Sequence, residues 1–335
     1  MEQYQYRQPW VSVRHQDGER DVSHMFRRIE WSGDVDSVCR KLALEMIVSA
    51  TDPRLPYVYL PLAGGIRMGV GEQTLFYGHV VSKDKSTDSS TMSVTCYDNG
   101  FYLKNSKASR KYKGETPEAI TRQLCSTYGV PTGALAQTGV SISRKFSAAA
   151  VYQIIDTAYT LASRQTGKKY LLRFDADKLE VVERTVTPQS VILSRGTNLQ
   201  TAAYGESMEN MKNRVIIVDS EGNFLRSVSD DAAVTRYGLL ADVLTQRDGE
   251  DATAEARDIL AENGVERTAS VSCLGHTKLI TGNTVWIHEP YTGLANTCWI
   301  DADKHVWQNG VYATSLTLNF KNEMRESESG SEADE

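Results

Sequence analysis

The chain has 335 residues, of which 40% are hydrophobic and 24% are charged, and its formal net charge is −6. This length suits about two domains with a sizeable core, and the composition excludes a disordered chain, a collagen-like fibre and a disulfide-dense mini-domain. Residues 321–335 hold two basic and six acidic residues, which is −4 of the total, so the nearly neutral remainder gives no electrostatic reason to expect nucleic acid or an anionic membrane as a partner.

Residues 1–107 are predicted to consist mostly of strands. Residues 10–13 alternate apolar and polar side chains, Asp17-Gly18 is a typical hairpin turn, and a second strand follows over 24–31. A helix is predicted over 35–46, because its apolar residues fall on one helical face: Val35, Val38, Cys39, Leu42 and Met46. Three further strands are predicted over 68–71, 73–81 and 91–97, with a charged hairpin tip or loop over 82–90.

The sequence changes character near residue 108, and residues 108–200 are predicted to form a small inserted α+β domain. Thr116-Pro117 begins a helix that Gly129 ends, since threonine caps helices and proline favours their first turn. A second helix is expected to end at Gly167. This helix, two short strands and a loose connector are predicted over 148–166, 170–174, 178–183 and 184–200.

Strands resume after residue 200. A hairpin, an apolar but irregular stretch and an amphipathic helix are predicted over 213–228, 232–244 and 251–264. Four more strands are predicted over 266–274, 284–289, 298–305 and 311–320. The tail, residues 323–335, is acidic and poor in apolar residues, which predicts disorder. The order strands, helix, strands thus occurs twice, which suggests two similar β domains flanking the insertion.

No catalytic or nucleotide-binding motif is evident in the sequence. Phosphate-loop, dinucleotide-binding, H-E-x-x-H and G-x-S-x-G patterns are all missing from it. The few, scattered cysteines predict reduced, buried thiols: Cys39, Cys96, Cys125, Cys273 and Cys298. No apolar run approaches the ~20 residues of a membrane span, and the N-terminus has no signal pattern, so synthesis in the cytoplasm is expected.

Cys273-Leu-Gly-His276 is the best candidate for a metal site. It supplies two of the four ligands that zinc usually takes, and three further candidates lie in the same region: His288, Cys298 and His305. A core cysteine and a surface histidine are the simpler interpretation, and neither a metal nor a cofactor is predicted.

The acidic segment over 301–305 is predicted to be a turn. Asp301 and Asp303 lack the further carboxylates of a calcium-binding loop and are interpreted as solvated turn residues. His305 is interpreted as a capping or hydrogen-bonding histidine rather than as a catalytic base.

Two groups of segments carry a family resemblance. The first is I-E-W-S-G-D at 29–34 with the residues that follow, G-H-V-V at 78–81 and C-Y-D-N-G-F-Y-L at 96–103. The second is L-I-T-G-N-T-V-W-I at 279–287, W-I-D-A-D-K-H at 299–305 and G-V-Y-A-T-S-L-T-L at 310–318. Together they resemble baseplate hub proteins of contractile phage tails and phage-tail-like bacteriocins. The closest type is the hub of defective Bacillus-type prophages and related clostridial particles, within the late-control protein D family.

The resemblance covers about residues 10–320, and Asn283 stands where many members have aspartate. It implies a mainly β chain with two tail-tube-like β-barrel domains and a small inserted α+β domain. The first barrel would comprise 1–107 with 201–245, and the insertion 108–200. The second barrel would comprise 246–322, followed by the disordered acidic tail 323–335.

Hubs of this family are trimers, and three copies with two barrels each give a ring of six-fold character. The resemblance therefore implies a structural hub that joins the hexameric tail tube to the trimeric central spike, with no enzymatic activity. The implied partners are two further copies of the chain, the tail tube protein, the central spike protein, a baseplate wedge or LysM-type tube-associated protein and the tape measure protein. The chain would be made in the bacterial cytoplasm and assembled in a virion tail or bacteriocin baseplate.

Two alternatives stay open, a cell-wall hydrolase and a carbohydrate- or peptide-binding β protein of the tail tip. Wall hydrolases usually show paired carboxylates, a Cys/His pair or a zinc site, and none is legible in this sequence.

The candidate functional residues are interface residues. The polar segment 82–90 could reach a neighbouring subunit, and the β-rich edges around 70–81 and 311–320 could line the ring. The residues predicted to lie at interfaces are Lys83, Asp84, Lys85, Asp88, Val80, Val81, Leu316 and Leu318.

Overall fold

A computed structural model describes residues 8–15, 18–49, 54, 58–187, 191–247, 249 and 251–333. The chain is mainly β, as predicted, and divides into two compact units. One unit comprises residues 1–202 with 270–335, and the other comprises residues 203–269. Among the described residues, no helix is both long enough and apolar enough to cross a membrane.

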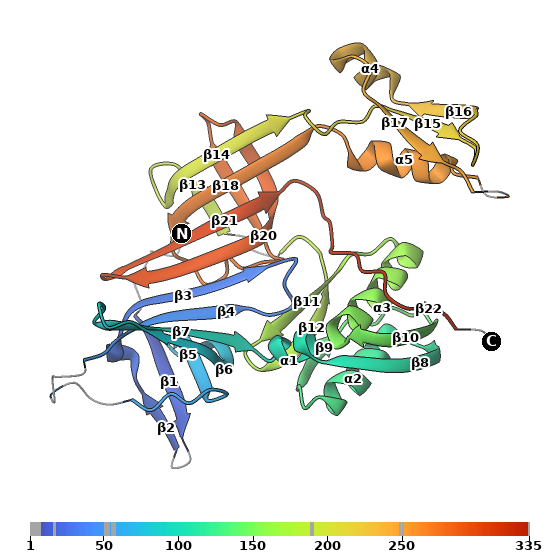
Figure 1. The fold of residues 1–335 in the computed structure, drawn as a ribbon. Helices are drawn as coiled ribbons and strands as arrows, with labels where there is room; N and C mark the ends of the chain where they lie inside the picture. Colours follow the sequence, from blue (N-terminus) through green and yellow to red (C-terminus); the bar gives the residue numbers. More distant parts are fainter. Residues whose placement is uncertain are drawn as a thin grey trace. The chain divides into compact units, whose positions relative to one another are not determined.

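One large sheet holds thirteen of the described strands (Figure 1). Its main path runs β14 (Leu199–Ser207), β18 (Glu266–Leu274), β21 (Val311–Asn319), β20 (Leu294–Gln308), β3 (Phe26–Asp34), β4 (Lys41–Ile47), β7 (Thr91–Asp98), β6 (Gln73–Lys85), β5 (Gly65–Val70), β1 (Pro9–His15) and β2 (Gly18–Asp21). β19 (Thr284–Glu289) pairs with β20, and β13 (Val191–Ser194) pairs with β19. The short helix η1 (Ser23–Met25) leads into β3.

The predicted helix over 35–46 is wrong, because residues 41–47 form strand β4 between β3 and β7. Leu42, Leu44 and Met46 are 0%, 2% and 3% exposed, so every second side chain enters the core. Leu42 and Met46 lie four residues apart, a spacing that fits the helical period and the strand period equally well. The intervening Leu44 fits only the strand, where it packs between its two neighbours.

Most predicted strands are confirmed. The predictions over 266–274 and 284–289 match β18 and β19, and those over 73–81, 91–97 and 311–320 match β6, β7 and β21 closely. A hairpin forms at the predicted turn, with His15 opposite Gly18, but its second strand is β2, which was not predicted. The strand predicted over 24–31 begins at Phe26 as β3, after η1, and the predicted turn residue Asp17 lies outside the described residues. The strand predicted over 298–305 is confirmed within the long strand β20, so the turn expected for 301–305 is wrong.

Residues 100–183 fold as an inserted α/β layer, here called the inserted subdomain. Its elements are α1 (Gly100–Asn105), β8 (Lys107–Glu115), α2 (Pro117–Thr127), β9 (Thr132–Leu135), β10 (Ile142–Ala150), α3 (Val151–Thr166), β11 (Tyr170–Asp175) and β12 (Lys178–Glu183). Both predicted helices are confirmed: the Thr116 hydroxyl accepts a hydrogen bond from the Ala119 amide, and Gly167 ends α3 at φ +73°. The core packs around Tyr159, Ile154 and Ile155.

The connector over 184–200 is not loose, because it supplies β13 and the first residues of β14 to the large sheet. The tail also differs from expectation. Residues 323–333, whose composition predicts disorder, lie against the inserted subdomain, where β22 (Ser331–Glu332) pairs with β10. Composition reports how little apolar area a segment can bury, and it misses polar contacts to a folded surface.

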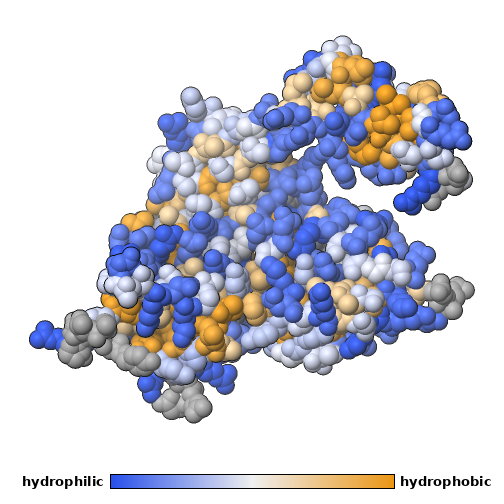
Figure 2. Space-filling model, viewed as in Figure 1, coloured by the Kyte–Doolittle hydropathy of each residue, from blue (hydrophilic) through white to orange (hydrophobic). Residues whose placement is uncertain are grey.

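The unit of residues 203–269 is a small three-stranded sheet with two helices. Its elements are β15 (Arg214–Val218), β16 (Phe224–Ser229), α4 (Asp231–Tyr237), β17 (Ala241–Thr245) and α5 (Thr253–Glu262), and its sheet order is β16–β15–β17. The hairpin predicted over 213–228 forms from β15 and β16, and β15 also pairs with β17 on its other side. One sheet face packs on α5. Figure 2 shows hydrophobic residues on the surface of this unit. Phe224, Leu239 and Val243 are exposed large hydrophobic residues of the unit.

Candidate functional site

The outer face of the large sheet carries a row of polar side chains that crosses five strands. Ser315 of β21 lies opposite Lys304 of β20, which lies opposite Ser32 of β3. Ser32 pairs in turn with Lys41 of β4, and Lys41 pairs with Tyr97 of β7. Because side chains alternate along a strand, the neighbours of these residues point into the core while this row faces water. The row joins residues from the two ends of the sequence in one continuous surface.

An open hollow of about 580 Å³ lies over this row. Hydroxyl and lysine side chains form much of its lining, including Ser270, Ser272, Thr317 and Lys304. The hydroxyls of Thr201 and Ser272 lie 2.5 Å apart across β14 and β18. Apolar residues such as Val271, Ala302 and Leu316 share the lining with these polar groups. Small-molecule sites are usually enclosed, so the open shape of this hollow argues against capture of a small ligand.

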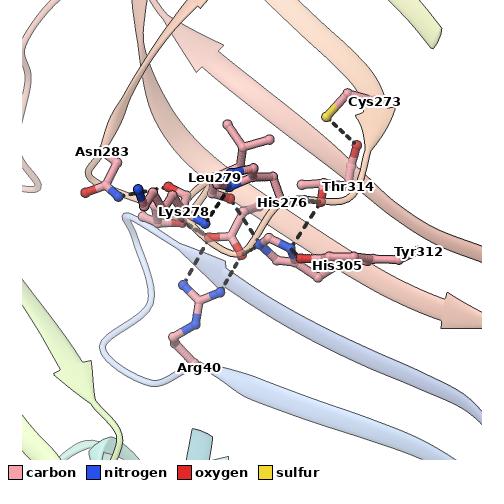
Figure 3. A network of polar contacts seen from close by, with 11 residues as sticks. Arg40, Cys273, His276, Lys278, Leu279, Asn283, His305, Tyr312 and Thr314 are labelled. Carbon is pink, nitrogen blue, oxygen red and sulfur yellow. Dashed lines mark hydrogen bonds and ion pairs between the residues drawn. The ribbon is translucent and has the colours of Figure 1, made fainter. Parts of the chain in front are cut away.

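A largely buried ion pair adjoins the hollow, because Asp303 is part of the hollow's lining. Figure 3 shows the network of polar contacts around Arg40 and His305. Arg40, in the turn before β4, donates from Nη1 to Asp303 of β20 at 3.0 Å, and its Nη2 also contacts that carboxylate. The backbone amide and the hydroxyl of Thr281 donate to the same carboxylate at 2.6 and 2.7 Å. Burial alone would raise the pKa of Asp303, but Arg40 and a hydrogen bond from His305 hold it below its usual range. Asp303 is therefore a structural anion and not the solvated turn residue expected from the sequence.

His305 continues this network into the core. Its Nε2 lies 3.0 Å from the Leu279 carbonyl oxygen and 3.2 Å from Asp303, and its Nδ1 lies 2.8 Å from the Tyr312 hydroxyl and 3.1 Å from that of Thr314. A neutral ring protonated on Nε2 satisfies all these partners. The order carboxylate, imidazole, hydroxyl resembles a catalytic relay, but His305 and Thr314 are 0% exposed, so no substrate reaches them. The sequence-based interpretation of His305 as a hydrogen-bonding residue agrees with this geometry.

The candidate metal ligands are engaged elsewhere. The Cys273 thiol donates to the Thr314 carbonyl oxygen at 3.5 Å. Over the described parts of the chain, no group of three or more histidine, cysteine, aspartate and glutamate residues is placed to hold a metal ion. The five cysteines are buried free thiols, and burial raises the pKa of Cys96, Cys125 and Cys273 to about 12. Thiols with such pKa values are unreactive near neutral pH.

The residues predicted to lie at interfaces differ in their exposure. Lys83, Asp84, Lys85 and Asp88 are exposed, around the end of β6, which continues four residues past its predicted end. Val81 is half-buried. The other three side chains are buried within the chain itself and are not available to a neighbour: Val80, Leu316 and Leu318.

Two exposed apolar residues lie close to this polar group, and sequence reasoning missed them. Lys83 Nζ donates to the Leu60 carbonyl oxygen at 2.6 Å, which ties residues 58–64 to β6. On either side of Leu60, Tyr59 and Leu62 are 57% and 62% exposed. Exposed apolar side chains beside charged ones are typical of protein–protein interfaces. No sequence period marked them, because they lie outside any strand or helix.

A family model and a protein of known sequence each match most of the chain. The model of the YQBQ-like family matches residues 29–319. The chain is 25% identical over 261 residues to the phage-like element PBSX protein XkdQ of Bacillus subtilis, a match that covers 75% of this chain and 80% of that protein.

Solved structures share its fold. The 43 kDa tail protein of prophage MuSo2 from Shewanella oneidensis matches with a TM-score of 0.70 and 14% identity, over 92% of this chain and 97% of that one. The E. coli c3393 protein is a component of the type VI secretion system with structural similarity to T4 bacteriophage tail proteins gp27 and gp5. It matches with a TM-score of 0.55 and 10% identity, over 91% of this chain and 76% of that one. These likenesses show a fold shared with phage tail proteins.

Proposed function

The chain belongs to the YQBQ-like family, and we propose that it is a structural protein of a phage-type tail, the baseplate hub. Three copies would form a ring that joins the hexameric tail tube to the trimeric central spike. The relative in the phage-like element PBSX and the fold shared with prophage and type VI secretion proteins support a place in such a particle.

The pairing of β3 with β20 is the observation that carries this proposal. Seven residue pairs, from Arg28 opposite Gln308 to Asp34 opposite Ala302, join the N-terminal and C-terminal strands edge to edge. Each end of the sequence thereby supplies one half of a single sheet, as a chain with two tube-like β-barrel halves needs. Three such chains present six halves around an axis, which resolves the mismatch between a six-fold tube and a three-fold spike.

The polar row would then face the central passage of the ring. A channel that conducts a polymer through water needs a lining without apolar patches that would bind it, and Ser32, Ser315 and Lys304 meet that need. The network under the row, in which Asp303 and His305 are buried, would link the two halves of the sheet through Arg40.

The exposed residues Lys83, Asp84, Lys85 and Asp88, with Tyr59 and Leu62, would contact the neighbouring copy. Apolar contacts at such a place supply binding energy, and charged contacts set the register of the two subunits. The further partners would be the tail tube protein, the central spike protein, a wedge or LysM-type tube-associated protein and the tape measure protein. The chain would act without catalysis or a cofactor, after synthesis in the bacterial cytoplasm.

Thiol labelling tests the assignment of the polar row. We would replace Ser315 with cysteine, co-express the chain with the tube and spike proteins of its particle, and compare labelling of the free and assembled forms. We expect a large polymer-linked maleimide to label the free chain only and a small maleimide to label both. The matched control, Thr127→Cys at the exposed end of α2, should not show this difference. Equal labelling of Ser315→Cys by the large reagent in the particle would contradict a lumenal face.

A further inference from the structure

The C-terminal residues 323–333, here called the strap, cross the surface of the inserted subdomain. The strap runs along α3 and ends as β22, which adds a two-residue strand to β10 (Figure 1). Met324 packs on the subdomain core, and its sulfur accepts a hydrogen bond from the Tyr170 amide at 3.5 Å. The strap therefore belongs to the folded surface, and its contacts show what it does there.

Arg325 of the strap connects the inserted subdomain to the large sheet. Its Nη1 donates to the carbonyl oxygen of Asp36, between β3 and β4, at 2.5 Å. Its Nη2 contacts the carboxylate of Asp156 on α3, and its guanidinium lies 5.2 Å from the ring of Tyr152 on the same helix. One side chain thus holds two parts of the fold together.

Arg184 makes a second connection at the start of the strap. Its side chain is 1% exposed, and it donates to the Glu323 carbonyl oxygen and, at 3.2 Å, to Asp301 of β20. Its guanidinium also lies 5.1 Å from the ring of Trp299 in the same strand. Arg184 directly follows the last strand of the inserted subdomain, so the strap, the subdomain and the large sheet meet at this residue.

The rest of the strap is held by contacts that water can replace. The amides of Ser327 and Ser329 donate to the hydroxyls of Thr160 and Thr157 at 3.1 and 3.2 Å. Arg144 donates to the carbonyl oxygens of residues 329 and 330, and the exposed Arg164 pairs with Glu326 and Glu328. Thr157, Thr160 and Arg164 lie on α3 and are polar, so lifting residues 326–331 would expose mainly hydroxyls and charges. Lifting Met324 would also uncover part of the subdomain core.

The buried pair at Arg325 also weakens the closed state. Burial raises the pKa of Asp156 to about 6 although Arg325 opposes the shift. Near neutral pH the ionised carboxylate is therefore poorly solvated where it lies, and opening returns it to water. A strap held by replaceable polar contacts and one incompletely compensated ion pair is suited to reversible release.

We propose that residues 323–333 form a releasable clamp, which fixes the inserted subdomain on the large sheet when closed and lets it turn against the sheet when open. Release would leave the two chain connections and contacts such as the hydrogen bond from Asn99 Nδ2 to the Asp177 carbonyl oxygen, 2.9 Å long. This proposal does not depend on the oligomeric state of the chain.

A disulfide lock tests the release. The side-chain oxygens of Thr157 and Ser327 lie 3.4 Å apart, so a Thr157→Cys/Ser327→Cys pair suits a disulfide. We expect amides 326–332 of the unmodified full chain to exchange with deuterium about tenfold faster than those of β8, and to slow when the lock is oxidised. Exchange of strap and β8 amides at one common rate would overturn the proposal.

Removing the counter-charge tests the clamping. Arg325→Gln should remove the contact with Asp36, leave Asp156 without its cation and increase strap exchange by about tenfold, the factor that one charge-assisted hydrogen bond carries. Dyes on Ser93→Cys of the sheet and Thr127→Cys of the subdomain should then report a broader distance distribution. Glu328→Gln, which removes an exposed bridge, is the control and should leave both readouts nearly unchanged. An unchanged distance distribution in Arg325→Gln, despite faster strap exchange, would overturn the clamping role.

Discussion

Asp98 and Asp303 are both buried carboxylates, yet their surroundings move their pKa values in opposite directions. Asp98 accepts hydrogen bonds from the amides of Arg40 and Gly100, at 2.8 and 2.9 Å, and burial raises its pKa to about 7. Asp303 faces the Arg40 guanidinium itself, and its pKa lies below the usual range. Arg40 therefore contacts both carboxylates: its backbone amide donates to Asp98, and its charged guanidinium pairs with Asp303.

The raised pKa of Asp98 predicts a pH-dependent stability. A carboxyl whose folded pKa lies above its unfolded value near 3.8 stabilises the fold at low pH, and this contribution is lost as the pH rises toward 7. We expect unfolding free energies in urea to show native Asp98 losing about 3 kcal/mol relative to Asp98→Asn between pH 5 and pH 7.5. Parallel pH profiles for the two proteins would contradict a raised pKa.

Asp303→Asn should destabilise the fold strongly. Arg40 is only 13% exposed, so the substitution leaves a buried cation without its anion, at about 3–5 kcal/mol. Glu45→Gln, which removes the more exposed bridge to Arg27, is the matched control and should change stability by less than about 1 kcal/mol. Chemical denaturation of both variants measures the difference, and similar losses would refute a structural role for the buried pair.

Local signals at single residues were predictable, and distant partners were not. The Thr116 cap and the Gly167 helix end depend on neighbours within a few residues, and the sequence states both. Arg40 meets a carboxylate 263 positions away, and no pattern around Arg40 indicates this. The sequence marked Asp303 and His305, but only the fold shows that they are buried together.

Strand β4 shows where periodicity fails at the scale of an element. Its apolar residues satisfy a helical and an extended period together, and pairing with β3 and β7 decides between them. Strands β18 and β19 alternate cleanly and were predicted to the residue. Strands β8 and β10 are rich in lysine, arginine and serine, so the sequence does not predict them as strands. They form strands because they pack on the core of the inserted subdomain.

The substitution Leu44→Ala distinguishes strand β4 from the helix that the sequence predicts over 35–46. In the strand, Leu44 is 2% exposed, so truncation should cost about 2–5 kcal/mol of unfolding free energy. In the predicted helix, Leu44 lies off the apolar face and truncation would cost little. Ala43→Ser, on the outer face of the same strand, is the control and should stay within about 0.5 kcal/mol. A negligible effect of Leu44→Ala would contradict the strand.

At the scale of the whole molecule, the sequence indicated two β-rich halves around an insertion, and the resemblance added the barrels and the ring. It could not show that β3 and β20 pair, because strands so distant in sequence leave no local trace. The proposed barrel boundaries stay a prediction. The compact unit of residues 203–269, with its own three-stranded sheet, is a feature that neither periodicity nor resemblance indicated.

Charge reversal at the end of β6 tests the contact between copies. Asp84→Lys with Lys85→Glu changes two exposed side chains, so the chain should fold with its stability within about 0.5 kcal/mol of the original. If this surface meets a neighbour, particle assembly measured by electron microscopy should fail while the circular dichroism spectrum is unchanged. Fully assembled particles carrying both changes would exclude this surface from the interface.

The mass of the protein in solution tests the proposed hub most directly. Light scattering should be carried out on the full chain alone and with the tube and spike proteins of its particle. A trimer, formed by the chain itself or only when the spike protein is added, is the result that a ring of three two-halved chains predicts. A chain that stays monomeric with every partner, and that binds or cleaves cell-wall fragments instead, would contradict the hub.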